Sequence, residues 1–406
     1  MILGLLAMGG TQAHPSASCG TLNVSSHGMV AVPGGSGGAL AKAAGYDAGS
    51  QGLLAVRGTH QVPVLSDSGY WEMESVFSNQ SLVVSNQALA GTGMVCANQG
   101  NAVVTYAIGN QVKSKRTTSG DSAVLQTEVD VGALLGNYSD LFAAVGGDNA
   151  TFYFASVDSA GGVLVQRTTN AGASWTSFPV HIHDAVSGPI SGSVSQPNNV
   201  VLIAYHTSST GIRVYSSGTQ TSTALALAGA SVSLASSQNT PGVVVAVANN
   251  LGSIYAVVSS NAGSVWTSTP VLVEQAVSPT GDVRLISTRV HWLATYLNPT
   301  RDLVMFRIAE DDLGATWTTG GTLFSGDATQ NNTFGSNSLA STGSGDGWVT
   351  ALVADADGAI RARACFDTPV EASNTPTTKA PTTKASLALP TASSTLLLIV
   401  AAVLMA

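Results

Sequence analysis

An eight-residue turn pattern that occurs three times constrains the fold of this chain more than any other feature. Its copies span residues 168–175, 259–266 and 310–317. Each has an Asn or Asp, then a Gly, then a Trp at fixed spacing. An Asn or Asp side chain can accept backbone N–H bonds in a tight turn, Gly supplies a positive φ, and Trp can anchor the turn on a sheet. The pattern therefore predicts a repeated turn between strands, with its Trp buried between neighbouring sheets. The structural residues predicted for these turns are Asn170, Gly172, Trp175, Asn261, Gly263, Trp266, Asp312, Gly314 and Trp317.

Short apolar segments recur along the chain at the spacing of a larger repeat. They begin near residues 53, 102, 152, 200, 243, 292 and 348, so that one occurs about every 50 residues. This is the length of a four-stranded β-propeller blade. Hairpin signals follow several of the segments, for example at 158–162, and no stretch has a sustained helical period. We therefore expect an all-β fold, a β-propeller of six or seven four-stranded blades. The number stays open because the first segment is the weakest.

The spacing of the turns resembles the Asp box, also called the bacterial neuraminidase repeat, of sialidases (neuraminidases) and other β-propellers. Asn170 and Asn261 stand where that family usually has Asp, and Asn can make the same local turn bond. In the family the box lies far from the catalytic centre. The resemblance therefore implies architecture and not activity.

The two ends of the chain differ in composition from its middle. Residues 1–13 resemble a signal peptide, with an apolar first strand as the alternative. The propeller is expected at 19–370, followed by a Thr/Pro-rich stalk at 371–386. The hydrophobic tail at 387–406 matches a signal for a glycosylphosphatidylinositol (GPI) anchor, with a C-terminal membrane helix as the alternative. These features predict a secreted protein held at the cell surface by a lipid anchor.

Composition argues against several partners. Charged residues make up 9% of the chain, the formal net charge is −8 and no basic run occurs, so we do not expect nucleic-acid binding. The sequence has no close spacing of Cys and His, so we expect no metal site, and we expect no cofactor. N-glycosylation motifs fit a secreted chain and occur at Asn23, Asn79, Asn137, Asn149 and Asn331.

The chain contains three cysteines, Cys19, Cys96 and Cys365. A propeller closes by pairing its first strand with its last blade, which would bring Cys19 and Cys365 together. We therefore predict a disulfide between these two, with Cys96 as the next candidate partner.

The resemblance also implies a test for catalysis. Sialidases of this fold use three arginines on the substrate carboxylate, a Tyr nucleophile assisted by Glu, and an Asp acid/base. The first arginine lies in an Arg-Ile-Pro motif, which this sequence lacks. Arg284 and Arg289 flank a predicted inner strand, from which side chains can reach the central channel; an ion pair between Arg284 and Asp282 is the local alternative. The candidates for a site of this kind are Arg57, Arg284, Arg289, Asp282, Glu274 and Tyr296.

Two functions stay open. The first is a sialidase-like surface protein that acts on or recognises glycans or glycoproteins; as an enzyme it would be a glycoside hydrolase of the exo-sialidase type. The second is a non-catalytic propeller for adhesion or protein binding, which the missing Arg-Ile-Pro motif favours. Convergence of three arginines at one end of the channel would distinguish them.

Overall fold

The computed structural model describes most of the middle of the chain and the strands on either side of it. The described residues are 18–22, 39–47, 51–60, 69–75, 80–85, 93–98, 101–108, 110–117, 126–133, 138–144, 150–208, 211–288, 291–309, 311–325, 334–341, 347–354 and 360–366, and side chains are described only within residues 101–323. Residues 1–369 form one compact unit, and everything below concerns this unit. The predicted signal peptide, stalk and hydrophobic tail lie outside the described residues, as do Arg289 and the five glycosylation asparagines.

The described residues form seven four-stranded antiparallel sheets. We number them as blades in chain order, each from its innermost strand outward. Blade 1 contains β2 (Ala39–Asp47), β3 (Gln51–His60), β4 (Gly69–Ser75) and β5 (Gln80–Ser85). Blade 2 contains β6 (Gly93–Asn98), β7 (Asn101–Ile108), β8 (Gln111–Thr117) and β9 (Val129–Ala133). Blade 3 contains β10 (Tyr138–Ala143), β11 (Phe152–Val157), β12 (Val163–Thr168) and β13 (Thr176–Phe178). Blade 4 contains β14 (Ser191–Ser195), β15 (Val200–His206), β16 (Ile212–Ser216) and β17 (Thr221–Ala224). Blade 5 contains β18 (Ser231–Ser236), β19 (Val244–Asn250), β20 (Ser253–Ser259) and β21 (Val271–Gln275). Blade 6 contains β22 (Arg284–Ser287), β23 (Trp292–Leu297), β24 (Leu303–Ala309) and β25 (Trp317–Ser325). Blade 7 contains β26 (Phe334–Ser341), β27 (Gly347–Ala354), β28 (Ile360–Phe366) and β1 (Ser18–Leu22).

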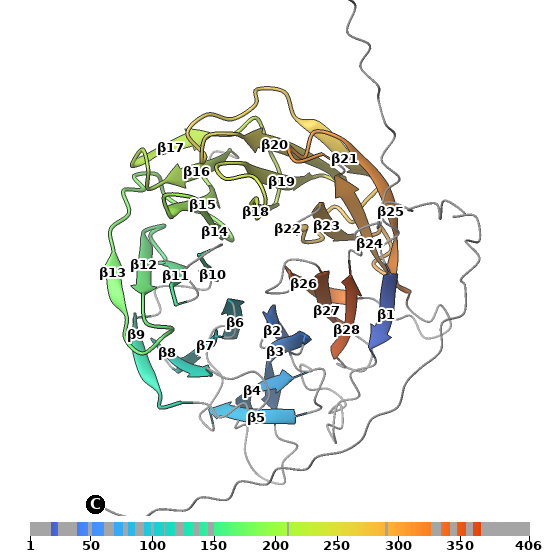
Figure 1. The fold of residues 1–406 in the computed structure, drawn as a ribbon. Coiled ribbons are helices and arrows are strands. Elements are labelled where there is room, and N and C mark those ends of the chain that lie inside the picture. The colour runs from blue at the N-terminus through green and yellow to red at the C-terminus, as the bar shows by residue number, and fades with distance from the viewer. Residues whose placement is uncertain are drawn as a thin grey trace, which may run out of the picture. The chain divides into compact units, whose positions relative to one another are not determined.

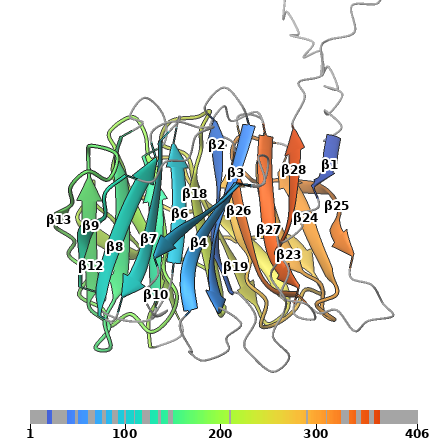
Figure 2. The same cartoon turned by 90° about the horizontal axis from the view of Figure 1, so that it is seen from below.

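The blades are arranged in a closed ring. The innermost strands β2, β6, β10, β14, β18, β22 and β26 contact one another in this order, and β26 contacts β2 again (Figure 1). Figure 2 shows the ring from the side, with the strands of neighbouring blades lying side by side. This confirms the predicted β-propeller and gives seven blades rather than six. Each of the seven apolar segments found in the sequence is the second strand of a blade.

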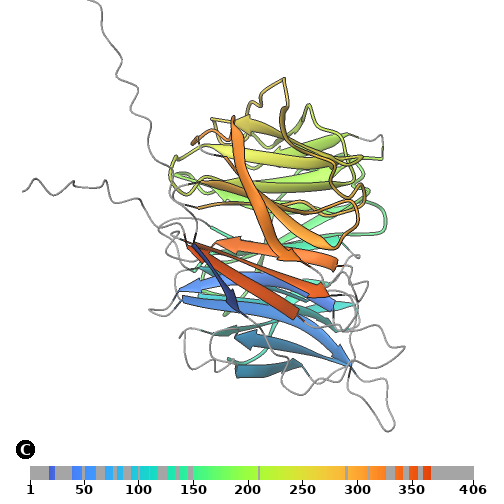
Figure 3. The same cartoon turned by 90° about the vertical axis from the view of Figure 1, so that its right-hand side faces the viewer.

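The ring is closed by the N-terminal strand. β1 forms the outermost strand of blade 7, antiparallel to β28, as Figure 3 shows for the dark blue and red strands. Blade 7 is thus built from the two ends of the propeller, and the loss of β1 would expose the edge of β28.

The hydrophobic core lies between the blades. One cluster joins blades 3 and 4, a second joins blades 4 and 5, and a third joins blades 5 and 6. Second strands such as β11 and β23 are buried along their whole length, which explains why they read as continuous apolar segments and not as alternating ones. Trp292 of β23 is among the largest of these buried side chains, with 2% of its surface exposed.

The first two repeated turns share one hydrogen-bond pattern. In the turn at 168–175, Asn170 accepts a bond from the backbone N–H four residues later at 3.0 Å, and Thr168 accepts one from the turn glycine at 2.9 Å. In the turn at 259–266, Asn261 and Ser259 take the same roles at 2.8 and 3.0 Å. Asn thus satisfies the backbone donors of these turns as Asp would.

The third turn differs, and one predicted residue is wrong there. The carboxylate that accepts backbone N–H bonds belongs to Asp311 and not to Asp312. The sequence has Glu310 where the first two turns have Thr or Ser, so the supporting hydroxyl of those turns is missing. Asp311 instead bonds three N–H groups itself, those of Leu313, Ala315 and Thr316.

The glycines of these turns let each blade approach the one before it. Gly172 and Gly263 have φ values of 86° and 80°. A Cβ atom on them would lie 3.1 Å from Val103 and 2.6 Å from Leu202, which belong to the second strands of the preceding blades. The turns therefore need Gly both for the backbone conformation and for the contact between blades.

The tryptophans of the turns lie at the boundaries between blades. Trp175 packs against residues of blades 2 and 3 and donates a hydrogen bond to Ser114 of blade 2 at 2.9 Å. Trp266 packs between blades 4 and 5 and Trp317 between blades 5 and 6, and each donates to the carbonyl of its own turn glycine. Each of the three stays partly exposed, rather than buried as expected from the sequence.

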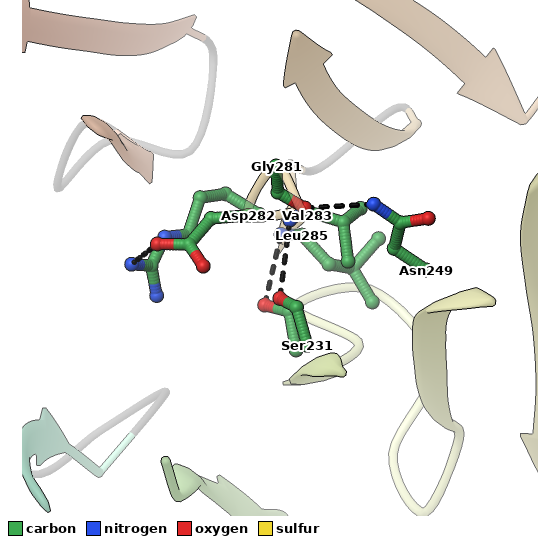
Figure 4. Close-up of polar contacts among 8 residues, drawn as sticks. Ser231, Asn249, Gly281, Asp282, Val283 and Leu285 are labelled. Carbon is green, nitrogen blue, oxygen red and sulfur yellow. Dashed lines mark hydrogen bonds and ion pairs between the residues drawn. The ribbon is translucent and has the colours of Figure 1, made fainter. Parts of the chain in front are cut away.

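Serine side chains join the innermost strands of neighbouring blades. An innermost strand pairs on one side only, so alternate N–H groups of its other edge need partners. Ser191 and Ser193 of blade 4 accept hydrogen bonds from two N–H groups of β18, at 3.1 and 3.0 Å. Ser231 of blade 5 accepts from the N–H of Val283, just before β22, at 3.2 Å, and Ser233 accepts from Leu285 of β22 at 3.0 Å (Figure 4). We call these four hydrogen bonds the serine seam; it links the central edges of blades 4, 5 and 6.

Candidate binding site between the blades

The described arginines do not converge on one end of the channel. Most of them lie on the third strand of a blade, away from the centre; these are Arg116, Arg167, Arg213 and Arg307, together with Arg361 and Arg363, of which only the backbone is described. Among the described residues, only Arg284 lies on an innermost strand. Several of the third-strand arginines take part in contacts between blades, as Arg116, Arg213 and Arg307 do.

The first polar cluster lies between blades 3 and 4. Asp184 comes from the segment that joins these blades, Tyr205 from the second strand of blade 4 and Arg213 from its third strand. The Tyr205 hydroxyl donates to Oδ2 of Asp184 at 2.9 Å, and Nε of Arg213 lies 3.0 Å from the same oxygen. The side chains of Arg213 and Asp184 are 33% and 39% exposed. The described residues provide no hydrogen bond to Oδ1 of Asp184, so this oxygen can accept one from a ligand.

The second cluster repeats the first between blades 5 and 6. Glu274 comes from the outermost strand of blade 5, and Tyr296 and Arg307 come from the second and third strands of blade 6. The Tyr296 hydroxyl donates to Oε2 of Glu274 at 2.8 Å, and Nε of Arg307 donates to the same oxygen at 2.6 Å. An acid from the blade boundary thus again meets a tyrosine and an arginine of the following blade.

Blade 2 carries a variant of this arrangement. The Tyr106 hydroxyl donates to Glu128, and Lys113 pairs with Asp130. Tyr106 lies opposite Lys113 in the strand register, as Tyr205 lies opposite Arg213. Here both acids come from the end of the same blade.

The environment of each cluster fixes its protonation. Burial raises the pKa of Tyr205 to about 12, together with its bond to Asp184. Burial and the bond to Glu274 raise the pKa of Tyr296 still further. Burial also pushes the pKa of Glu274 upward, but the bonds from Gln275 and Tyr296 and the charge of Arg307 outweigh it and hold the pKa below its usual value. At neutral pH the tyrosines are therefore neutral donors and Glu274 is an anion.

Two pairs of the predicted site residues meet, but they do not form one site. Tyr296 bonds Glu274, and Arg284 forms an ion pair with Asp282 at 2.8 Å. Arg284 is the register partner of Thr295, the residue before Tyr296, so the two pairs lie on opposite faces of the sheet. Arg57 lies on β3, where only the backbone is described, and Arg289 lies outside the described residues.

The position of Asp282 is set by the loop that leads to β22. Asn249 is buried and its side-chain amide donates to the carbonyls of Ser278 and Gly281, at 2.8 and 2.7 Å. Figure 4 shows Asn249 and Asp282 on opposite sides of this loop. The local ion pair of Arg284 is therefore held by its own loop, and within the described residues no second arginine accompanies it.

One signal in the sequence could have revealed the clusters. Three of the seven apolar segments end in tyrosine, at Tyr106, Tyr205 and Tyr296, and each is followed by a basic residue on the next strand. The acids could not be found in this way because they come from different places in the blades.

The described residues contain no group of three or more His, Cys, Asp or Glu side chains placed to hold a metal ion. Nor do they contain a helix with the length and hydropathy needed to span a membrane.

The comparisons with known proteins find only distant similarity. No family model matches the sequence, and no curated protein does. Among solved structures, AofleA from Arthrobotrys oligospora is 14% identical, with a TM-score of 0.48, and the alignment covers 76% of this chain and 95% of that one. A fucose-specific lectin from Aleuria aurantia is 13% identical, with a TM-score of 0.45 and coverage of 70% and 95%. A subtype N10 neuraminidase-like protein of A/little yellow-shouldered bat/Guatemala is 7% identical, with a TM-score of 0.43 and coverage of 86% and 100%. Scores this low do not assign a function.

Proposed function

We propose that this protein is a glycan-binding β-propeller and that the clusters at the blade boundaries are its binding sites. The observation that carries the proposal is the repetition of one polar arrangement at two boundaries, Asp184 with Arg213 and Glu274 with Arg307, each held by a buried tyrosine. The two clusters share a carboxylate, a tyrosine and an arginine, with Asp in one and Glu in the other, and they lie two blades apart.

The chemistry of the clusters suits sugar hydroxyls. A carboxylate accepts hydrogen bonds from hydroxyls, and guanidinium N–H groups not used within the protein can donate to hydroxyl oxygens; in Arg213, Nε faces Asp184 and Nη2 donates to the carbonyl of Ser222 at 2.8 Å. In the cluster between blades 3 and 4 both groups are about one third exposed, at 33% and 39%. Because the two charges compensate each other, such a site favours neutral sugars over the carboxylate of a sialic acid.

The same geometry supports binding rather than sialidase turnover. Tyr296 has 4% of its surface exposed and lies on the second strand of blade 6 rather than on an innermost strand, so its hydroxyl is poorly placed to attack a sugar. Burial raises the pKa of Tyr296, which further disfavours a phenolate nucleophile. The resemblance of the turns to the Asp box remains, in this proposal, a statement about architecture.

A panel of immobilised glycans tests the proposal. The purified, labelled protein should bind neutral glycans, such as galactosylated or fucosylated chains, and free sugar should compete. In parallel, a fluorogenic sialic acid substrate should not be hydrolysed. Hydrolysis that Tyr296→Phe abolishes would contradict the proposal. Absence of binding to every glycan on the panel would also contradict the proposal and would favour adhesion through protein contacts.

Display at the cell surface is a separate part of the proposal. It rests on the apolar start, the Thr/Pro-rich segment and the hydrophobic tail of the sequence. Treatment of intact cells with a phosphatidylinositol-specific phospholipase should release the protein. If it stays on the cells, and peptide mapping still finds residues 396–406, a membrane helix replaces the lipid anchor.

A further inference from the structure

A cavity opens at one end of the ring, between blades 4 and 5. Its volume is about 550 Å³. Loops that precede the inner strands and turns that follow the second strands form its wall. It is separate from the clusters described above, since none of their residues lines it.

The residue at the rim of this cavity is unfavourable for folding. Leu251 is 88% exposed and has a φ of 50° in the two-residue turn between β19 and β20. With Gly252 at 93°, this is a turn in which both residues have positive φ, where Asn or Gly is strongly preferred at the first position. A leucine there is strained and also exposes apolar surface to water. Residues that break local rules without a gain in packing are expected at functional sites.

The wall of the cavity is uncharged and mostly apolar, with a few polar groups. None of the described residues that line it is Asp, Glu, Lys or Arg. It offers the hydroxyls of Ser187 and Ser208 and the amide of Asn250, whose side chain makes no hydrogen bond within the described part of the chain. An anion or a cation would find no partner in such a wall, whereas a neutral ligand with several hydroxyls would.

A histidine in the wall supports this description. His206 is 8% exposed, and its Nε2 atom has no hydrogen-bond partner among the described residues. Burial lowers the pKa of His206, so its ring is neutral near neutral pH and adds no charge to the cavity. A buried polar atom without a partner is costly, so a ligand group that bonds Nε2 of His206 would remove this cost.

From these observations we propose that the cavity binds the ring of a neutral sugar, with Leu251 covering its apolar face. The site is distinct from the blade-boundary clusters, so it can exist whether or not those clusters bind glycans.

The test uses the double variant Arg213→Gln/Arg307→Gln, in which the boundary clusters are disabled. Saturation-transfer NMR is recorded with D-galactose, N-acetyl-D-glucosamine, L-fucose and, as the anionic comparison, N-acetylneuraminic acid. At least one neutral sugar should receive saturation, and N-acetylneuraminic acid should receive less. Adding Leu251→Asn should lower the affinity at least about tenfold, while the midpoint of thermal unfolding rises because the strain is relieved.

Gln220 provides the matched control. It is exposed with a φ of 56° in the turn between β16 and β17, at the opposite end of its blade from the turns that line the cavity. Gln220→Asn should raise the unfolding midpoint without changing sugar binding. The proposal is overturned if no neutral sugar receives saturation, if Leu251→Asn leaves the affinity unchanged, or if N-acetylneuraminic acid binds best.

Discussion

Cys19 of β1 lies directly opposite Cys365 of β28 in the strand register that closes the ring. Residues directly opposite each other in an antiparallel pair have Cα atoms about 4.5–5.5 Å apart. This separation falls within the range that a disulfide spans, about 4.4–6.8 Å. The ring topology expected from the sequence is therefore present, and the bridge itself stays a prediction.

We predict that this disulfide forms and stabilises the propeller. Non-reducing peptide mapping should find residues 19 and 365 in one linked fragment. Cys365→Ser should lower the free energy of unfolding by about 2–4 kcal/mol, because the unfolded chain then loses a very long closed loop. Cys96→Ser is the control and should leave urea unfolding unchanged. A linked fragment that contains Cys96 would show that the pairing is wrong.

The serine seam predicts a second effect on stability. Ser233 accepts the N–H of Leu285 at 3.0 Å in a buried setting. Ser233→Ala leaves that N–H without a partner and should cost about 1–3 kcal/mol. Ser268, which is exposed, serves as the control, and Ser268→Ala should unfold at the parent's urea concentration. Equal midpoints for the two variants would mean that the seam contributes nothing.

Replacing Trp292 should lower the free energy of unfolding more than replacing Trp266. Trp292 is 2% exposed, and its replacement by Ala should cost about 3–5 kcal/mol. Trp266 is partly exposed, so Trp266→Ala should cost only about 2 kcal/mol. Thermal or urea unfolding of both variants measures the order. A larger loss for Trp266 than for Trp292 would contradict the packing described between the blades.

His206 should make stability depend on pH. Burial lowers the pKa of His206 below its usual value of 6.5 in the folded state. Between the folded and unfolded pKa values the unfolded chain binds more protons than the folded one. The free energy of unfolding therefore has its full value above about pH 6.5 and falls as the pH drops through the folded pKa. Urea unfolding at about pH 7.5 and about pH 5.5 should show this loss, and His206→Gln should reduce it. Parallel profiles for parent and variant would rule out His206 as the cause.

The sequence predicted the architecture better than the chemistry. The fully buried second strands have a strong local signal, so segments such as the one at 200–206 were found at nearly their true positions. The number of blades could not be fixed because the first blade has a weak signal and none of the repeated turns. Asp312 was chosen over Asp311 because spacing alone does not tell which carboxylate reaches the backbone of a turn.

The candidate sites were predicted less well because they depend on which blades meet. Glu274 and Tyr296 were both named as candidates, but their contact depends on an outer strand of one blade reaching the second strand of the next. Asp184 and Arg213 were not named, since no local pattern connects a loop residue with a third strand. Leu251 carries no signal in the sequence at all, because its strain appears only once the turn between β19 and β20 is known.

The central claim is that the boundary clusters bind glycans, and the most direct test is calorimetric. The glycan that binds best on the panel is titrated into the parent and into Arg213→Gln/Arg307→Gln. The control variant is Arg116→Gln, because Arg116 also lies on a third strand but bonds the backbone carbonyl of Asn170 and has no carboxylate partner in the described contacts. The double variant should bind at least about tenfold more weakly, or about 1.4 kcal/mol, while Arg116→Gln binds like the parent, and a circular dichroism spectrum like that of the parent should show that the double variant is folded. Equal affinity of the parent and the double variant would contradict the account.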